Sequence, residues 1–298
     1  MSMSIVHPSQ SPSPRRKLHT LKSSEYEHEF DKKALASINK IPILPSVFRK
    51  LNQLGIEKLL KIQLTGSYLK ITDRNFPHVY QIFEEACQIL EIEKPPLFYI
   101  EPGFAQINAF TAGVEQPILV VNRYAVDMLT EEELLFVLGH ELGHVKSNHL
   151  LYTQVASVLP SIGEAIGNAT FGLGSIATSG LQLGLDHWRR MAEFTADRAG
   201  LLTCQDLRVA TKTLMKMAGL PEKYFNETVV EDFILQAQEF HEYSYDNLDK
   251  IVKFFSNLQN THPWTVVRAS EMLKWVESPE YNFIINRSQN STSAIVVR

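Results

Sequence analysis

The stretch Leu134–His149, LLFVLGHELGHVKSNH, constrains the fold of the chain most strongly. It contains His140, Glu141 and His144 in the order H-E-x-x-H. Residues four apart share one face of an α-helix, so the two histidines would project the same way and could hold one zinc ion. The glutamate lies about 100° further round the helix, where it can reach a metal-bound water without ligating the metal. The spacing therefore predicts a helix that carries a zinc site with a general base beside it.

The start and the apolar face of this stretch favour a buried helix. Thr130 is an expected N-cap, and Glu133 three residues later would complete a capping box. Gly139 and Gly143 each cost roughly 1 kcal/mol relative to Ala in a helix, so we expect other backbone or substrate to approach closely there. The alternative interpretation is a surface helix with two ordinary histidines. The apolar face argues against it, and its members are Leu134, Leu135, Leu138, Leu142 and Val145.

The composition is that of a globular protein with a sizeable core. The chain has 298 residues, of which 44% are hydrophobic and 21% are charged. The formal net charge of −4 gives no general attraction to nucleic acid, so no nucleic-acid partner is expected. Cys87 and Cys204 predict neither a disulfide framework nor a cysteine zinc site. The N-terminus lacks the 7–15-residue apolar core of a secretory signal, and we expect a cytoplasmic protein that could associate with a membrane.

Local composition divides the chain into four segments. Residues 1–25 are rich in Ser, Pro and basic residues and predict a disordered tail. Residues 26–64 predict an N-terminal helical segment, 65–285 the zinc-site domain, and 286–298 a flexible tail.

Three short strands are expected directly before the H-E-x-x-H helix, at 97–100, 107–113 and 117–122. A small sheet should therefore pack against that helix. The expected fold class is α+β and predominantly α.

The segment 150–185 is the least ordinary part of the chain. Ala165–Leu185 has no charged residue and is long enough to span a bilayer, but it contains five glycines and several polar residues. The small apolar gain of its large side chains predicts helical or looped structure packed over the site as a mobile cover. Peripheral membrane contact through 150–185 is compatible with this expectation, and a membrane-inserted hairpin is the alternative.

A catalytic zinc usually has three protein ligands, so a third must lie elsewhere in the chain. The motif H-E-x-x-H-x-x-G-x-x-H is excluded, because Ser147 and Leu150 stand where Gly and His are required. His149 follows His144 by five residues, so we expect it to point away from the ligand face as a surface histidine.

Glu193 is the favoured third ligand. It precedes Asp197 by four residues, so both lie on one helical face. A second helix packed on the first could bring the Glu193 carboxylate to the zinc, while Asp197 accepts the remaining N–H of a ligating histidine. An amphipathic helix with a solvated acidic side is the alternative.

Four motifs together resemble the zinc peptidase family that includes the bacterial heat-shock protease HtpX and the CAAX prenyl endopeptidases. They are NAFTAG (108–113), EEELLFVLGHELGHVKSNH (131–149), EFTADRAG (193–200) and THPWTVVR (261–268). The resemblance covers about 65–276. It implies a Glu-zincin fold with one zinc per chain on His140, His144 and Glu193, and with Glu141 as general base.

The same resemblance implies roles for further residues of the site. Asp197 would support the site, and His262, with Arg268 nearby, would approach it and stabilise the oxyanion. The chain lacks the convincing transmembrane helices of HtpX and the CAAX enzymes, and Trp264 replaces a smaller residue after the His-Pro pair. A CAAX-like substrate is therefore not expected.

These features predict a zinc-dependent endopeptidase that acts on peptides or unfolded proteins. Pro117–Asn122 is expected to be an edge strand to which an extended peptide could add. The residues expected to bind substrate are Asn108, Ala109, Pro117, Ile118, Leu119 and Val120. The alternatives are a non-catalytic zinc-binding quality-control factor and a membrane-integrated protease of the same family.

Overall fold

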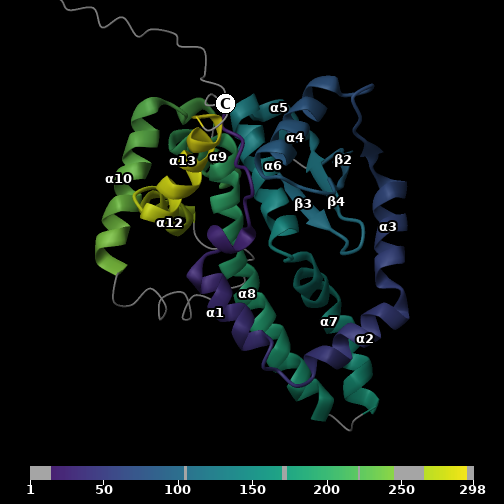
Figure 1. The fold of residues 1–298 in the computed structure, drawn as a ribbon. Helices are drawn as coiled ribbons and strands as arrows, with labels where there is room; N and C mark the ends of the chain where they lie inside the picture. The colour runs from purple at the N-terminus through teal and green to yellow at the C-terminus, as the bar shows by residue number, and fades with distance from the viewer. Residues whose placement is uncertain (1–14, 104–105, 170–172, 221, 245–264, 294–298) are drawn as a thin grey trace, which may run out of the picture.

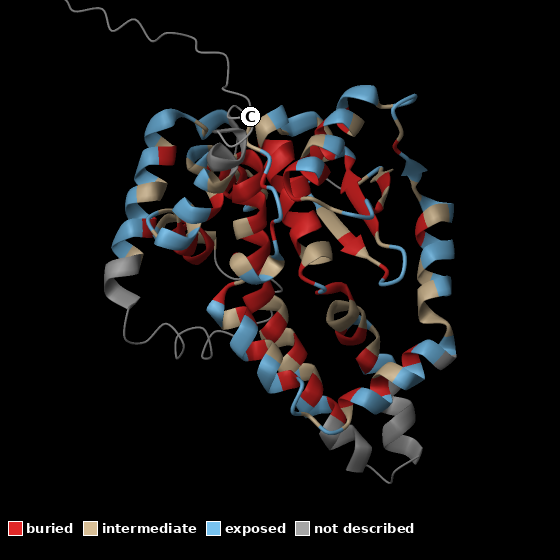
Figure 2. Ribbon diagram, viewed as in Figure 1, coloured by how far each residue is buried: buried red, intermediate tan, exposed pale blue. Residues whose placement is uncertain are grey.

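The computed structural model describes residues 15–103, 106–169, 173–220, 222–244 and 265–293. Helix α6 (Glu131–Lys146) contains the H-E-x-x-H sequence and lies between a small sheet and helix α8 (Leu173–Cys204) (Figure 1). The predicted capping box is confirmed, because Thr130 Oγ1 accepts the Glu133 N–H at 3.3 Å and the Glu133 carboxylate accepts the Thr130 N–H at 2.9 Å. Every residue of α6 from Glu133 to Gly143 is buried (Figure 2).

The sheet has four strands in the order β1-β2-β4-β3, and the predicted α+β fold with a small sheet is confirmed. The strands are β1 (Leu69–Lys70), β2 (Leu97–Glu101), β3 (Ala109–Ala112) and β4 (Ile118–Asn122). Strand β4 pairs parallel with β2 and antiparallel with β3, whereas β3 pairs only with β4 among the described strands. The edge strand predicted at 117–122 is therefore wrong: its backbone is paired on both sides, and β3 is the edge that faces α6.

Helices surround α6 on the remaining sides. The main core joins α6 to α4 and α9 and to the inner face of the sheet, while a second core joins α1, α2, α7 and α8. The other helices are η1 (Ser23–Glu25), α1 (Glu29–Ile38), α2 (Leu44–Leu54), α3 (Ile56–Ser67), α4 (Pro77–Ile89), α5 (Arg123–Met128), α7 (Leu150–Ala169), α9 (Leu207–Met217), η2 (Glu222–Tyr224), α10 (Glu227–Ser244), α12 (Thr265–Val276) and α13 (Pro279–Ser293).

Small residues bring α6 and α8 into close contact. The close approach that was expected at Gly139 and Gly143 is confirmed. A Cβ on Gly143 would lie 2.5 Å from the Ala199 Cβ, and a Cβ on Gly139 would overlap the Thr203 hydroxyl. The close approach carries side chains of α8 to the histidine face of α6.

Both predicted tails are partly wrong. Leu18 and Leu21 are 1% and 4% exposed and belong to the main core, so the chain is packed from residue 15 onward. Helix α13 extends through residues 286–293, and Arg16 donates to the backbone carbonyl of Ile285 at 3.1 Å. Two isolated leucines within a polar, proline-rich stretch gave no periodic signal, yet they fill gaps in the core. Residues 1–14 and 294–298 lie outside the described part.

The segment 150–185 contributes α7 and the first part of α8, which extend together away from the sheet (Figure 1). Near its base, Leu181, Leu185 and Trp188 of α8 are buried in the core shared with α1 and α2. Among the described residues, no helix has both the length and the apolar character needed to cross a membrane.

Candidate metal centre

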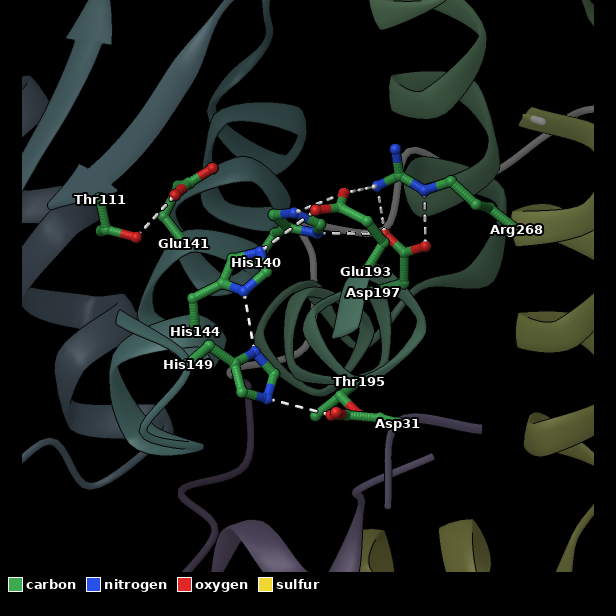
Figure 3. A network of polar contacts seen from close by, with 10 residues as sticks. All are labelled: Asp31, Thr111, His140, Glu141, His144, His149, Glu193, Thr195, Asp197 and Arg268. Carbon is green, nitrogen blue, oxygen red and sulfur yellow. Dashed lines mark hydrogen bonds and ion pairs between the residues drawn. The ribbon is translucent and has the colours of Figure 1, made fainter. Parts of the chain in front are cut away.

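Three side chains from two helices converge at the α6–α8 contact (Figure 3). His140 and His144 of α6 and Glu193 of α8 each present a ligand atom within 4.8 Å of the others. Nε2 of His140 lies 3.5 Å from Glu193 Oε2, and Nε2 of His144 lies 3.6 Å from Glu193 Oε1. Ligands about 2.0–2.1 Å from a tetrahedral ion are about 3.4 Å apart, so the observed spacing fits a shared metal.

The charge of the group also fits a divalent cation. Three carboxylates, those of Glu141, Glu193 and Asp197, are buried with one guanidinium, that of Arg268. These four side chains have a net charge of −2, and without a metal the proton held by His140, whose pKa is raised, offsets only one of the two charges. Buried charges are stable only when paired or bound to a metal, so the group as built has the charge to accept one dication.

His140 is oriented by a buried ion pair behind it. Its Nδ1 lies 3.1 Å from Asp197 Oδ1, and Arg268 donates to both oxygens of Asp197, from Nε at 2.7 Å and from Nη2 at 2.6 Å. Burial alone would raise the pKa of Asp197, but the charge and hydrogen bonds of Arg268 hold it below its ordinary value. The supporting role that the resemblance implies for Asp197 remains a prediction, and Arg268 contacts the carboxylate of Asp197.

The pKa of His140 shows how strongly its surroundings favour a positive charge. Burial lowers this pKa, but the hydrogen bonds and charges of Asp197 and Glu193 raise it to about 10. A ligating imidazole must be neutral, so a metal ion would compete with this proton for Nε2. The carboxylates that retain the proton would equally attract the metal.

His149 is buried, and the prediction that it is a surface histidine is wrong. Helix α6 ends at Lys146, and Asn148 adopts φ of +57°, so the chain turns back instead of continuing the helix. The His149 N–H bonds to the His144 carbonyl at 3.0 Å, which is the closing bond of a Schellman motif. The turn sets the His149 ring against His144, with the two Nδ1 atoms 2.9 Å apart.

Glu141 points away from the ligand pair toward the edge strand β3 (Figure 3). Thr111 of β3 donates its hydroxyl hydrogen to Glu141 Oε2 at 3.0 Å, a contact that sequence reasoning did not anticipate. His140, Glu141, Glu193 and Arg268 line a cavity of about 540 Å³. Glu141 therefore lies beside the candidate ligands at the wall of a space large enough for part of a peptide.

The six predicted substrate residues lie in different places relative to this cavity. Asn108 and Ala109 line it, whereas Ile118, Leu119 and Val120 are buried in the central strand β4. Pro117 lines a different cavity, of about 880 Å³, near the end of α6.

Two further predictions concern what surrounds the cavity. No described residue of 150–192 lines it, so the cover predicted from 150–185 is wrong for the described residues. His262 lies outside the described residues.

The fold and the site together define a metallopeptidase-like protein, predominantly helical, with candidate ligands from two packed helices and a glutamate beside them. The model of peptidase family M48 matches residues 73–276, and the chain belongs to this family.

Relatives agree with that assignment. The chain is 29% identical to the chloroplastic plastoglobule-localized metallopeptidase 48 of Arabidopsis thaliana, over 92% of this chain and 78% of the relative. It is 26% identical to protease HtpX homolog 2 of Methanosarcina acetivorans, over 55% of this chain and 62% of the relative. It is 23% identical to the protease HtpX homolog of Ralstonia pickettii, over 71% and 78% of the two chains. No solved structure gives a significant match.

Proposed function

We propose that this chain is a zinc-dependent endopeptidase in which His140, His144 and Glu193 bind one zinc ion and Glu141 is the general base. The observation that carries the proposal is the convergence of the three donor groups beside a fourth, non-ligating glutamate that faces a cavity. A purely structural metal site has no need of such a glutamate.

Bound zinc would lower the pKa of a water molecule and polarise the scissile carbonyl. Glu141 then accepts a proton from the attacking water and delivers it to the leaving amine. The Thr111 hydroxyl occupies Oε2 of Glu141, and Oε1 has no hydrogen-bond partner among the described residues. Thr111 therefore fixes the carboxylate and leaves one oxygen for proton transfer.

The substrate would lie along strand β3. The Asn122 N–H bonds to the Asn108 carbonyl at 2.9 Å, and paired residues alternate along an antiparallel ladder. By this alternation the backbone groups of Ala109 and Thr111 face the open edge, next to Glu141. An extended peptide can add to such an edge through backbone hydrogen bonds, which favours peptides and unfolded proteins over folded ones.

The role proposed for His262 rests on the resemblance to the family. His262 would donate to the oxyanion, and His262→Ala should then lower kcat about 10²–10³-fold. A change confined to KM would assign His262 to substrate binding instead.

A cytoplasmic location with peripheral membrane contact through 150–185 is also proposed, and the plastoglobule location named for one relative is compatible with contact at a lipid surface.

The decisive experiment compares wild type with Glu141→Gln on a denatured proteome, with new peptide ends identified by mass spectrometry. The substitution keeps the shape of the side chain but removes the base, so zinc should be retained while the rate falls roughly 10²–10⁴-fold or more. Glu132→Gln makes the same change in the first turn of α6, at a side chain that is 40% exposed, and should cleave like wild type. Equal cleavage by Glu141→Gln would remove the general-base assignment, and absence of cleavage by wild type would favour the non-catalytic alternative.

A further inference from the structure

We propose that Asp31 and His149 are positioning residues for the metal ligand His144, which makes helix α1 part of the metal centre. The inference rests on the proposed function, because it takes His144 to bind the metal. Asp31 lies in the first turn of α1, outside the residues 73–276 that match the peptidase family.

The His149 ring stands between His144 and Asp31 (Figure 3). Its Nδ1 is 2.9 Å from Nδ1 of His144, and its Nε2 is 3.0 Å from Asp31 Oδ2. His149 and Asp31 are 2% and 3% exposed. The three side chains thus form an unbroken line from the half-buried His144 at the candidate metal centre, through two buried residues, to the N-terminal segment.

One arrangement of protons allows His144 to bind a metal through Nε2. A neutral imidazole carries one N–H, so the proton of His144 must be on Nδ1 and must be donated to Nδ1 of His149. The proton of His149 is then on Nε2, from which it is donated to Asp31. A carboxylate can only accept hydrogen bonds, so with Asp31 at the end every N–H in the line must be donated from His144 toward Asp31. Asp31 therefore selects the tautomer in which His144 presents a lone pair to the metal.

Asp31 is itself held rigidly by α8. Trp188 Nε1 donates to Asp31 Oδ1 at 2.8 Å, and Thr195 Oγ1 donates to Asp31 Oδ2 at 2.7 Å. Thr195 is two residues from Glu193, so the stretch of α8 that supplies the third ligand also anchors the carboxylate behind the second. A displacement of α1 would therefore be transmitted to His144.

Each candidate histidine ligand is thus backed by a buried carboxylate. His140 reaches Asp197 directly, whereas His144 reaches Asp31 through one additional imidazole. Partners behind a ligating histidine fix its ring orientation and tautomer, and their loss typically weakens metal affinity 10–100-fold.

The test is the affinity of the full-length protein for Zn²⁺, measured by competition with a chromophoric chelator at fixed pH. Asp31→Asn keeps the size of the side chain but removes its charge and its acceptor-only character. His149→Phe keeps a ring between His144 and Trp188 but removes both nitrogens. Each variant should bind Zn²⁺ about 10–100-fold more weakly than wild type. The double variant should lose no more Zn²⁺ affinity than the single variant with the larger loss, because both residues act on His144 through the same line of hydrogen bonds.

The buried pair of His28 and Glu271 provides a matched control. His28 Nε2 lies 2.9 Å from Glu271 Oε2, so this pair also joins the start of α1 to the body of the protein through a histidine and a carboxylate. Glu271→Gln should change the Zn²⁺ affinity less than about twofold, and melting in the presence of chelator should show that all the variants are folded.

Wild-type affinity in Asp31→Asn would overturn the inference, as would an equal loss in Glu271→Gln or additive losses in the double variant. A wild-type protein that binds no Zn²⁺ would overturn the proposed function and the inference with it.

Discussion

At the scale of the residue, the close contact between α6 and α8 depends on glycines, which have no Cβ to hold the two helices apart. Gly143→Ala would place a Cβ 2.5 Å from the Ala199 Cβ, so α6 and α8 would have to separate. Overpacking of this kind costs about 1–3 kcal/mol, more than the roughly 1 kcal/mol that Ala gains over Gly in a helix. Urea unfolding should show a lower free energy of unfolding for Gly143→Ala. Gly180→Ala in α8, where a Cβ would meet nothing within 4 Å, should raise it; a rise in both variants would contradict the packing argument.

The sequence predicted the residues of the candidate site whose positions follow from helix periodicity. His140, His144 and Glu193 were reachable because four-residue spacing on two helices defines two faces that can meet. His149 was misplaced because the helix ends before it, and an Asn at C′ is a weaker signal for an αL turn than a Gly. Asp31 was missed altogether, because its contact with His149 joins positions far apart in the chain and no local pattern marks it.

At the scale of the element, η1 is fastened to α13 by an ion pair. Arg287 donates to both carboxylate oxygens of Glu25, at 2.9 and 3.2 Å. Burial raises the pKa of Glu25, but the Arg287 guanidinium and the Lys22 N–H bring it below its ordinary value. A carboxyl whose folded pKa is lowered contributes stability above its unfolded pKa of about 4.3, and this stability is lost as the pH falls through the folded value.

Glu25→Gln should therefore be less stable than wild type near neutral pH, by up to about 1 kcal/mol, and the difference should shrink as the pH falls below about 4.3 and vanish once the pH is below the folded pKa of Glu25. Urea unfolding at several pH values measures the difference. The same substitution in an Arg287→Ala background should show a smaller effect. A difference that widens as the pH falls would contradict the assignment.

The elements themselves were more predictable than their order. The strands at 97–100, 107–113 and 117–122 were located from runs of apolar and β-branched residues, and all three occur. The identity of the neighbours of β4 could not be predicted, because strand pairing is non-local and ILVVN alone does not say which strands lie on either side of it. An almost continuous apolar run indicates a strand buried on both faces, and β4 is buried at every residue. That signal should have placed β4 at the centre of the sheet.

At the scale of the whole molecule, the metal would join the two cores. The two candidate histidine ligands belong to α6, which lies in the main core, and Glu193 belongs to the part of α8 that packs in the core with α1 and α2. Without a metal, the proton that the raised pKa keeps on His140 offsets only one of the two excess negative charges, so a net negative charge remains at the contact between the two helices. A metal that binds the folded chain better than the unfolded chain must therefore raise the stability of the entire fold.

Removal of the metal should lower the melting temperature. A ligand present at 1,000 times its Kd stabilises the native state by about 4 kcal/mol, which corresponds to a shift on the order of 10 °C for a chain of this size. Thermal melts with and without a strong chelator measure the shift, and added Zn²⁺ should restore the original value. Glu193→Gln retains the shape of the ligand but weakens its hold on a cation, so its melting temperature should respond little to chelator. If the chelator has removed the zinc from the wild type and the melting temperature is unchanged, the idea that the metal joins the two helices is contradicted.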